Sequence, residues 1–333
     1  MKILLVDWTW GIHGGPEEFL MGINLELVSR GEETRIVQEG SWKRLFIETQ
    51  KNLYWADLVI CFAFPASLMV GLTKKPCMWI CYDVPEAFYK WHKVPAFWGN
   101  KQIWNMSNRQ IICSNVTDAY SLETIYHRKV DAIIPLAVDS KYFSHNGRLG
   151  IGDGIFRLCQ VGTILRNKNQ LETIDIFRKF LKEVPNSQLV LAGPRIPTGS
   201  GPAYWDACIN RIVDYEMDGK VHMPGHYEKD EVRGLYTSWA NVYMNNLRGT
   251  GGWLAVLEAM STGLPVVSSK WFFGWEYLYP FAWVGDNILE GLLEVYNNYE
   301  LYKGLAEQGS KWISENLTYK KYVDKLMEVI SAN

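Results

Sequence analysis

The sequence of 333 residues lacks the features that mark several large classes of protein. Its longest apolar stretch, residues 58–72, is interrupted by Pro65 and Ser67 and is too short to span a bilayer. No secretory leader is expected, because the apolar start of the chain stops at Asp7. There is no excess of basic residues: 34 Lys and Arg against 36 Asp and Glu give a net charge of −2, which argues against nucleic-acid binding. With 48% hydrophobic and 21% charged residues, the composition is that of a soluble globular protein.

The sequence also lacks common nucleotide-binding motifs and metal-binding patterns. No G-x-G-x-x-G follows the first predicted strand and no G-x-x-x-x-G-K-[ST] is found, which weighs against a dehydrogenase or an NTPase. Only six cysteines are present, scattered through apolar segments, so we expect them to be reduced and buried. Cys77 and Cys81, like His222 and His226, do not have the spacing of metal ligands, and no metal site is expected.

What is present is a regular alternation of short apolar strands and amphipathic helices. The first predicted strand covers residues 2–7, and the helix after it carries Phe19, Ile23 and Leu27 on one face before it ends at Gly31. The strands are continuous apolar runs rather than alternating ones, which indicates parallel sheets covered by helices on both faces. Further strands are expected within residues 56–62, 76–83, 109–114 and 130–136.

A second series of strands and helices follows residues 140–154, a segment rich in glycine and polar residues that reads as a linker. The sequence therefore predicts two doubly wound α/β domains, with ligands bound at the carboxyl ends of the strands and in the cleft between the domains. Strands are expected within 156–162, 187–193, 220–223, 240–245 and 264–269, and helices within 169–184, 203–217 and 229–239.

The most informative stretch is "GTGGWLAVLEAMSTGLPVVSS", residues 249–269. A glycine-rich turn follows a strand and opens a helix, so the backbone can approach a ligand and present unpaired N–H groups to phosphate or sugar oxygens. Glu258 lies about two turns into this helix, where its carboxylate could accept hydrogen bonds from a diol such as a ribose. A helix N-terminus followed by a solvated glutamate would give the same pattern.

This stretch resembles the signature of the family-4-type (group 1) retaining glycosyltransferases, which have the GT-B fold. Residues 14–31, 112–143, 161–177 and 272–278 are similar to further motifs of that family, in the family's order. The resemblance implies two Rossmann-like doubly wound domains that face each other across a cleft. Residues 1–145 would form the acceptor-side domain and residues 146–315 the nucleotide-sugar domain, with a C-terminal helix over 316–333 that crosses back to the first domain.

The resemblance also implies roles for individual residues. Glu258 would bind the ribose hydroxyls of the donor nucleotide, and Lys168 would contact its diphosphate. Gly14 and Gly15 would form the loop of the first domain that meets the sugar or acceptor, and Glu276 lies in a later motif. The backbone of Gly251, Gly252 and Trp253 would hold the β-phosphate and the sugar.

The sequence departs from the family pattern at three positions. Thr250 stands where the family has the first glutamate of its pair, and Thr163 stands where it has a phosphate-binding arginine. Either Arg166 or Arg248 could supply that charge instead. Tyr82 stands where the family often has a histidine. These changes bear on the identity of the donor sugar and on activity.

On the acceptor side, the sequence offers Asp83 and an aromatic stretch. Asp83 is a candidate catalytic contact to the acceptor, grouped with Lys168 and Glu258, and is equally well explained as a strand-end cap. Residues 86–109 include Trp91 and Trp98; they would stack on sugars, meet membrane headgroups, or simply cover the core. His13 and Tyr82 complete the acceptor-side candidates.

The predicted function is transfer of a sugar from a nucleotide-diphosphate sugar to a glycan, lipid or small-molecule acceptor with retention of configuration. The resemblance implies that no metal and no cofactor are needed. Fixed positive charge and a helix dipole would stabilise the leaving diphosphate instead, and this diphosphate would itself help to deprotonate the acceptor. The alternative is a catalytically degenerate GT-B protein that binds a nucleotide sugar or a glycan; a phosphorylase or an epimerase is a third reading. A cytoplasmic location is expected, with peripheral membrane contact left open and no nucleic-acid partner.

Overall fold

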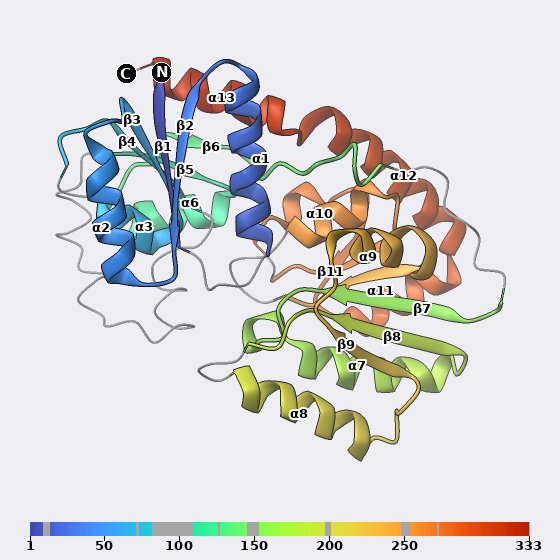
Figure 1. Ribbon diagram of the computed structural model, residues 1–333. Coiled ribbons are helices and arrows are strands. Elements are labelled where there is room, and N and C mark those ends of the chain that lie inside the picture. Colours follow the sequence, from blue (N-terminus) through green and yellow to red (C-terminus); the bar gives the residue numbers. More distant parts are fainter. Residues whose placement is uncertain are drawn as a thin grey trace. The chain divides into compact units, whose positions relative to one another are not determined.

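The computed structural model describes residues 1–8, 14–70, 73–81, 109–125, 127–144, 153–196, 201–247, 254–271 and 273–332 (Figure 1). The chain divides into two compact units. Unit 1 comprises Met1–Val138 together with Leu317–Asn333, and unit 2 comprises Asp139–Asn316. Each unit is an α/β structure built on its own sheet, as the sequence predicts.

Unit 1 contains a six-stranded parallel sheet in the order β2-β1-β3-β4-β5-β6. Its central strands β3 and β4 are buried along their whole length, which explains their unbroken apolar sequences. The edge strand β2 buries only Val37, so its sequence carries little strand signal. The strands are β1 (Lys2–Trp8), β2 (Glu33–Glu39), β3 (Leu58–Phe62), β4 (Cys77–Cys81), β5 (Gln110–Cys113) and β6 (Ala132–Ile133).

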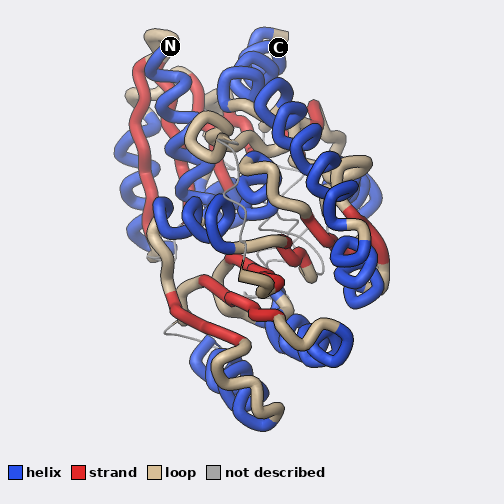
Figure 2. Tube along the Cα trace, turned by 90° about the vertical axis from the view of Figure 1, so that its right-hand side faces the viewer, coloured by secondary structure: helices blue, strands red, loops and turns tan. Residues whose placement is uncertain are grey.

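Helices cover both faces of this sheet, as Figure 2 shows. Helix α1 buries Phe19, Ile23 and Leu27, which confirms the predicted apolar face. Figure 1 shows α1 and α13 side by side. The described helices of unit 1 are α1 (Gly15–Ser29), α2 (Trp42–Leu53), α3 (Ala63–Met69), α6 (Val116–Ile125) and α13 (Tyr319–Ser331).

Helix α13 is an integral part of unit 1 although it follows unit 2 in the sequence. Its Tyr322 ring meets Phe19 of α1 edge-on at 5.1 Å, and its Tyr319 ring lies directly over Gly22. An ion pair of 2.8 Å joins Arg30, the residue after α1, to Asp324 of α13. Where the chain leaves and re-enters the unit, the Val138 amide donates a hydrogen bond of 2.9 Å to the Leu317 carbonyl.

Unit 2 contains a second six-stranded parallel sheet, in the order β12-β11-β10-β7-β8-β9. Its core gathers the inward apolar side chains of these strands with those of α7, α8 and α11. The strands are β7 (Phe156–Val161), β8 (Ser187–Ala192), β9 (Val221–Gly225), β10 (Val242–Asn245), β11 (Val266–Ser269) and β12 (Trp283–Gly285). The helices are α7 (Gln170–Glu183), α8 (Gly201–Asp214), α9 (Lys229–Gly234), α10 (Leu254–Ser261), α11 (Ile288–Asn297) and α12 (Tyr299–Asn316), with the short helical segments η2 (Arg166–Lys168), η3 (Leu235–Trp239) and η4 (Trp275–Tyr277).

The segment predicted as a linker begins as a packed part of unit 2. Phe143 is buried against the ring of Tyr236 at 6.3 Å, and the Tyr142 hydroxyl donates a hydrogen bond to Asp230. Tyr142 and Phe143 thus attach the start of this segment to unit 2, although the polar residues around them predicted a linker. The predicted boundary between residues 145 and 146 lies outside the described residues and stays a prediction.

Two expectations from composition bear on the whole chain. All six cysteines are buried and free, which confirms their predicted state. Among the described helices, none combines the length and the apolar character that a membrane crossing would need.

Candidate functional site

The strand order of unit 2 reverses direction between β7 and β10. From β7 the chain proceeds outward through β8 and β9, and from β10 it proceeds the opposite way through β11 and β12. In doubly wound sheets, ligands bind at such a reversal, outside the carboxyl ends of the strands. In unit 1 the corresponding reversal lies between β1 and β3. The candidate site of unit 2 is built at its reversal.

The loop after β7 is held against the loop after β8 by close backbone contact. The Gly162 amide donates to the Ala192 carbonyl at 2.9 Å, and Gly162 has a φ of +148°, which favours glycine. A Cβ at Gly193 would lie only 2.0 Å from the Gly162 carbonyl oxygen. Glycine is therefore required at 193 for the two loops to approach each other.

Lys168 lies in the turn η2 that this loop leads into. Its carbonyl accepts a hydrogen bond of 2.7 Å from Nε2 of the buried Gln160, and its amide donates to Leu165. The next residue, Asn169, donates from Nδ2 to the Asn246 carbonyl at 3.2 Å, just beyond β10. These bonds fix the backbone of Lys168 beside the reversal point.

Two other predicted donor contacts lie in the same loop. Thr163 is half-buried, and its carbonyl accepts a hydrogen bond of 3.0 Å from Nε2 of Gln170. Arg166 is exposed at the start of η2. The loop thus brings Thr163, Arg166 and Lys168 together.

Glu258 is half-buried on α10, and its charge acts on two buried tyrosines. Burial raises the pKa of Tyr236 and of Tyr243, and the negative charge of Glu258 adds to the rise of both. The two rings meet edge-on at 5.8 Å, and the Tyr243 hydroxyl donates to the Val161 carbonyl at 3.2 Å. Glu258 lies on the helix that follows β10, and Lys168 lies in the turn that follows β7, on the other side of the reversal.

Buried amide side chains line this edge of the sheet. Asn245 donates from Nδ2 to Ser268 Oγ at 2.9 Å, but its Oδ1 has no hydrogen-bond partner among the residues that the structure describes. An unsatisfied buried polar atom costs about 1–3 kcal/mol, and such atoms concentrate where a ligand or ordered water completes them. The amides with one such atom are Gln160, Asn167, Gln170, Asn245 and Asn246.

These amides were not singled out from the sequence. The available signal was the polar pair "NN" at the end of the apolar strand "ANVYMNN", where a solvent-exposed loop is the simpler reading. Their burial depends on neighbouring strands and loops, which the local sequence does not specify.

Tyr204 of α8 is hydrogen-bonded to the start of α7, and its raised pKa makes stability depend on pH. Its hydroxyl oxygen accepts a hydrogen bond of 3.1 Å from the Leu171 amide, and burial raises the pKa of Tyr204 to about 12. Because an unfolded tyrosine has a pKa near 10, this contribution to stability is complete below about pH 10 and is lost as the pH rises through about 12.

At neutral pH, we expect the free energy of unfolding of Tyr204→Phe to be about 1 kcal/mol below that of the wild type, because the hydrogen bond is missing. As the pH rises into the alkaline range, however, the variant should lose less stability than the wild type does. By about pH 12 the difference between the two proteins should have shifted by about 2–3 kcal/mol in favour of the variant. Urea unfolding followed by circular dichroism from pH 8 upward measures this. Parallel alkaline profiles would contradict the assignment.

In unit 1, Gly14 and Gly15 stand at the start of α1, after β1. Gly14 is the N-cap in extended conformation, and its carbonyl accepts from the Glu18 amide at 3.1 Å. Two acids that the sequence did not single out are buried nearby in the chain, Asp7 on β1 and Glu17 in the first turn of α1.

The remaining sequence candidates stay predictions. Glu276 lies on η4, beyond the end of β11, with a buried Oε1 for which the described part of the chain provides no hydrogen-bond partner. The others lie outside the described residues: His13, Tyr82, Asp83, Trp91, Trp98, Arg248, Thr250, Gly251, Gly252 and Trp253.

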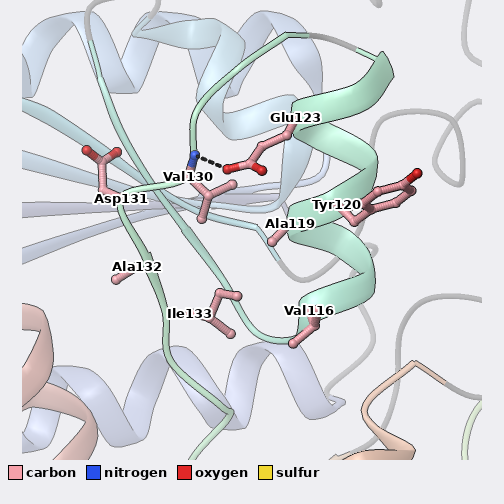
Figure 3. A pocket seen from close by; sticks show the side chains of 8 residues that line it. All are labelled: Val116, Ala119, Tyr120, Glu123, Val130, Asp131, Ala132 and Ile133. Carbon is pink, nitrogen blue, oxygen red and sulfur yellow. Dashed lines mark hydrogen bonds between the residues drawn. The ribbon is translucent and has the colours of Figure 1, made fainter.

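Unit 1 also has a surface hollow, and the residues that line it are not among these candidates. Figure 3 shows it between α6 and β6, with Val116 and Ile133 near one end and Glu123 near the other. Glu123 accepts a hydrogen bond of 3.4 Å from the Val130 amide, and Asp131 accepts one of 2.7 Å from Ile111. Its two carboxylates thus hold the backbone, and no predicted site residue lines the hollow.

The family model described as Glycosyl transferases group 1 matches residues 145–312. The chain belongs to this family. The described candidates of unit 2, namely Thr163, Arg166, Lys168 and Glu258, all lie within the matched residues of this group 1 member.

Comparison with individual proteins agrees with this membership. The chain is 26% identical over 121 residues to the alpha-monoglucosyldiacylglycerol synthase of Acholeplasma laidlawii, a match that covers 36% of this chain and 28% of that protein. The match thus spans just over a quarter of that relative's length.

Solved structures show the fold of this family member. The Anabaena HepE structure, a complex with UDP and glucose, superposes with a TM-score of 0.79 at 14% identity and covers 100% of both chains. Sucrose-phosphate synthase from Thermosynechococcus elongatus superposes with a TM-score of 0.82 at 13% identity and covers 99% of this chain and 98% of that one. The two sheets and their helices thus form the GT-B fold predicted from the sequence.

Proposed function

We propose that unit 2 binds a nucleotide-diphosphate sugar at the reversal between β7 and β10, and that the protein transfers this sugar with retention of configuration to a glycan, lipid or small-molecule acceptor. The observation that carries the proposal is that Lys168, in η2 after β7, and Glu258, on α10 after β10, follow the two strands between which the order reverses. Membership of the group 1 family supports it.

Each residue has a chemical role in this proposal. The Lys168 ammonium neutralises charge on the diphosphate as the bond between the sugar's anomeric carbon and the phosphate oxygen breaks. The acceptor oxygen bonds to the same face of that carbon, and its proton passes to the departing phosphate oxygen. Glu258 accepts hydrogen bonds from the ribose hydroxyls. Buried amides such as Asn245 and Gln160 supply further donors and acceptors.

The protein needs no metal and no cofactor under this proposal, because fixed cations take the charge of the leaving group. Arg166 is the described cation of the loop that can assist Lys168 where Thr163 replaces the arginine expected at that position. Arg248 and the backbone of residues 251–253 remain proposed donor contacts, and Asp83 remains the proposed acceptor contact.

Nucleotide binding tests the proposal directly. One of UDP, GDP, ADP and CMP, present at about 100 times its Kd, should stabilise the wild type by about 2.7 kcal/mol in thermal unfolding. Glu258→Ala should lose most of this effect. Glu183→Ala, which removes an exposed glutamate from the end of α7, is the matched control and should keep it.

Two results decide between the readings. If no nucleotide stabilises the wild type, or if Glu258→Ala responds as the wild type does, the donor site is wrong. If a nucleotide binds but no nucleotide is released from its sugar conjugates in the presence of acceptors, the protein is a binding-only member. The observation that favours this second interpretation is that Thr163, an uncharged residue, stands where the family has a phosphate-binding arginine.

A further inference from the structure

Three aromatic side chains are exposed close together in the sequence just beyond β11. Trp271 is 58% exposed, Trp275 41% and Tyr279 66%. Large aromatic residues are usually buried for most of their surface, so three exposed ones within nine residues call for a functional explanation. Residues 270–271 and 273–279, hereafter the aromatic turn, follow β11 at the carboxyl edge of the sheet, where the proposed donor site also lies.

Trp275 and Tyr279 are separated by one helical turn. The Tyr279 amide donates to the Trp275 carbonyl at 3.3 Å, so the two residues have the i, i+4 relation that places side chains next to each other. Between them Leu278 is fully buried and anchors the turn to the core. The turn is thus held by its apolar side while it presents two rings to solvent.

The charges of the aromatic turn disfavour an anionic partner. Lys270 pairs with Asp286 at 2.5 Å, and its ammonium lies 5.8 Å from the centre of the Trp271 ring. The other charged residue of the segment is Glu276, an acid. No surplus positive charge remains in it to attract anionic lipid headgroups or nucleic-acid phosphates.

The same groups suit a neutral sugar. A pyranose ring has faces of C–H groups, which pack on aromatic rings, and a rim of hydroxyls, which need hydrogen-bond acceptors. Glu276 lies next to Trp275, and its half-buried side chain carries a carboxylate, a group that accepts hydrogen bonds. Stacking rings and an adjacent acceptor are therefore combined in one turn.

We propose that the aromatic turn binds the sugar rings of a neutral oligosaccharide, and that the acceptor of the transfer reaction is such a chain. The second statement rests on the proposed function; the first does not. Two exposed rings one helical turn apart engage successive sugars, so a chain binds the turn while a single monosaccharide does not.

Affinity electrophoresis tests the binding surface on the full-length protein. Native gels that contain dextran, laminarin or galactomannan should retard the wild type in at least one case, and glucose should not compete. The double variant Trp275→Ala/Tyr279→Ala should bind that polysaccharide about tenfold more weakly, as truncation of an anchoring ring does. Trp275→Phe, which keeps a ring, should retain most of the affinity.

The matched control is Tyr54→Ala, which removes a ring that is 80% exposed on unit 1, and it should be retarded like the wild type. Circular dichroism checks that each variant is folded, and Tyr279→Ala alone replaces the double variant if that one is not. The proposal is overturned if no polysaccharide retards the wild type, or if the double variant is retarded equally. It is also overturned if the double variant instead loses sedimentation with phosphatidylglycerol vesicles.

Failure of this proposal and failure of the proposed function give different results. The double variant should keep the nucleotide-induced stabilisation of the wild type, because its rings are not part of the diphosphate site. Retardation without any nucleotide binding would leave the glycan surface intact and remove the donor site. Nucleotide binding without retardation would leave the donor site intact and remove the glycan-binding surface.

Discussion

Replacement of Lys168 by alanine is expected to lower kcat for sugar transfer by about 10²–10³-fold. The reason is that a fixed charge aimed at the leaving group acts most strongly in the transition state, where removal of one such contact typically costs that factor. The hydrogen bonds from Gln160 to the Lys168 carbonyl and from Asn169 to the Asn246 carbonyl do not involve the Lys168 side chain, so the substitution leaves them in place. The measurement is steady-state release of the nucleotide from the donor identified by binding.

Lys182→Ala is the control, because Lys182 is an exposed lysine in the last turn of α7 and should leave kcat unchanged. Lys168→Arg keeps the charge in a different shape and should fall between the wild type and the alanine variant. A rise in KM alone, with kcat intact, would mean that Lys168 binds the ground state and transition state equally and has no part in leaving-group departure.

Gly193→Ala should destabilise unit 2 by about 3 kcal/mol, the upper range for an added methyl group in a closely packed place. The new Cβ would lie 2.0 Å from the Gly162 carbonyl oxygen and 3.2 Å from the Thr163 nitrogen. Both are backbone atoms, so no side chain can swing aside and the loop after β7 has to move. Differential scanning calorimetry measures the loss, and nucleotide affinity should fall with it.

Gly304→Ala is the matched control. A Cβ at Gly304, within α12, meets nothing within 4 Å, so this change should stabilise the helix by about 0.5–1 kcal/mol. An unchanged melting temperature for Gly193→Ala would show that the contact between the two loops does not constrain the native state.

Much of the fold could be predicted because its signals are local. Strands such as β3 are buried on both faces, so their whole sequence is apolar, and α1 shows its buried face as a regular spacing of apolar residues. Strand β2, which buries little, gave no such signal. The order of the strands could not be predicted from the residues alone, since the placement of β10 beside β7 depends on pairing between segments more than 80 residues apart.

The candidate site divides in the same way. Lys168 and Glu258 stand in motifs that a sequence displays directly, whereas the burial of Gln160 and Asn245 arises only when loops from distant strands meet. The exposure of Trp275 and Tyr279 could not be predicted from the sequence either. Trp275 and Tyr279 flank the buried Leu278 in an aromatic, apolar segment that would be expected to be core, and only the helical turn sorts the rings outward.

The docking of α13 on α1 has a consequence for how the protein is made. On the ribosome, unit 2 is complete once residue 316 has emerged, while unit 1, begun first, still lacks its final helix. Until Tyr322 arrives, the Phe19 edge that it covers stays open to solvent and to chaperones. The unit whose synthesis starts first therefore finishes folding last, and a chain truncated before α13 leaves unit 1, not unit 2, exposed to proteolysis.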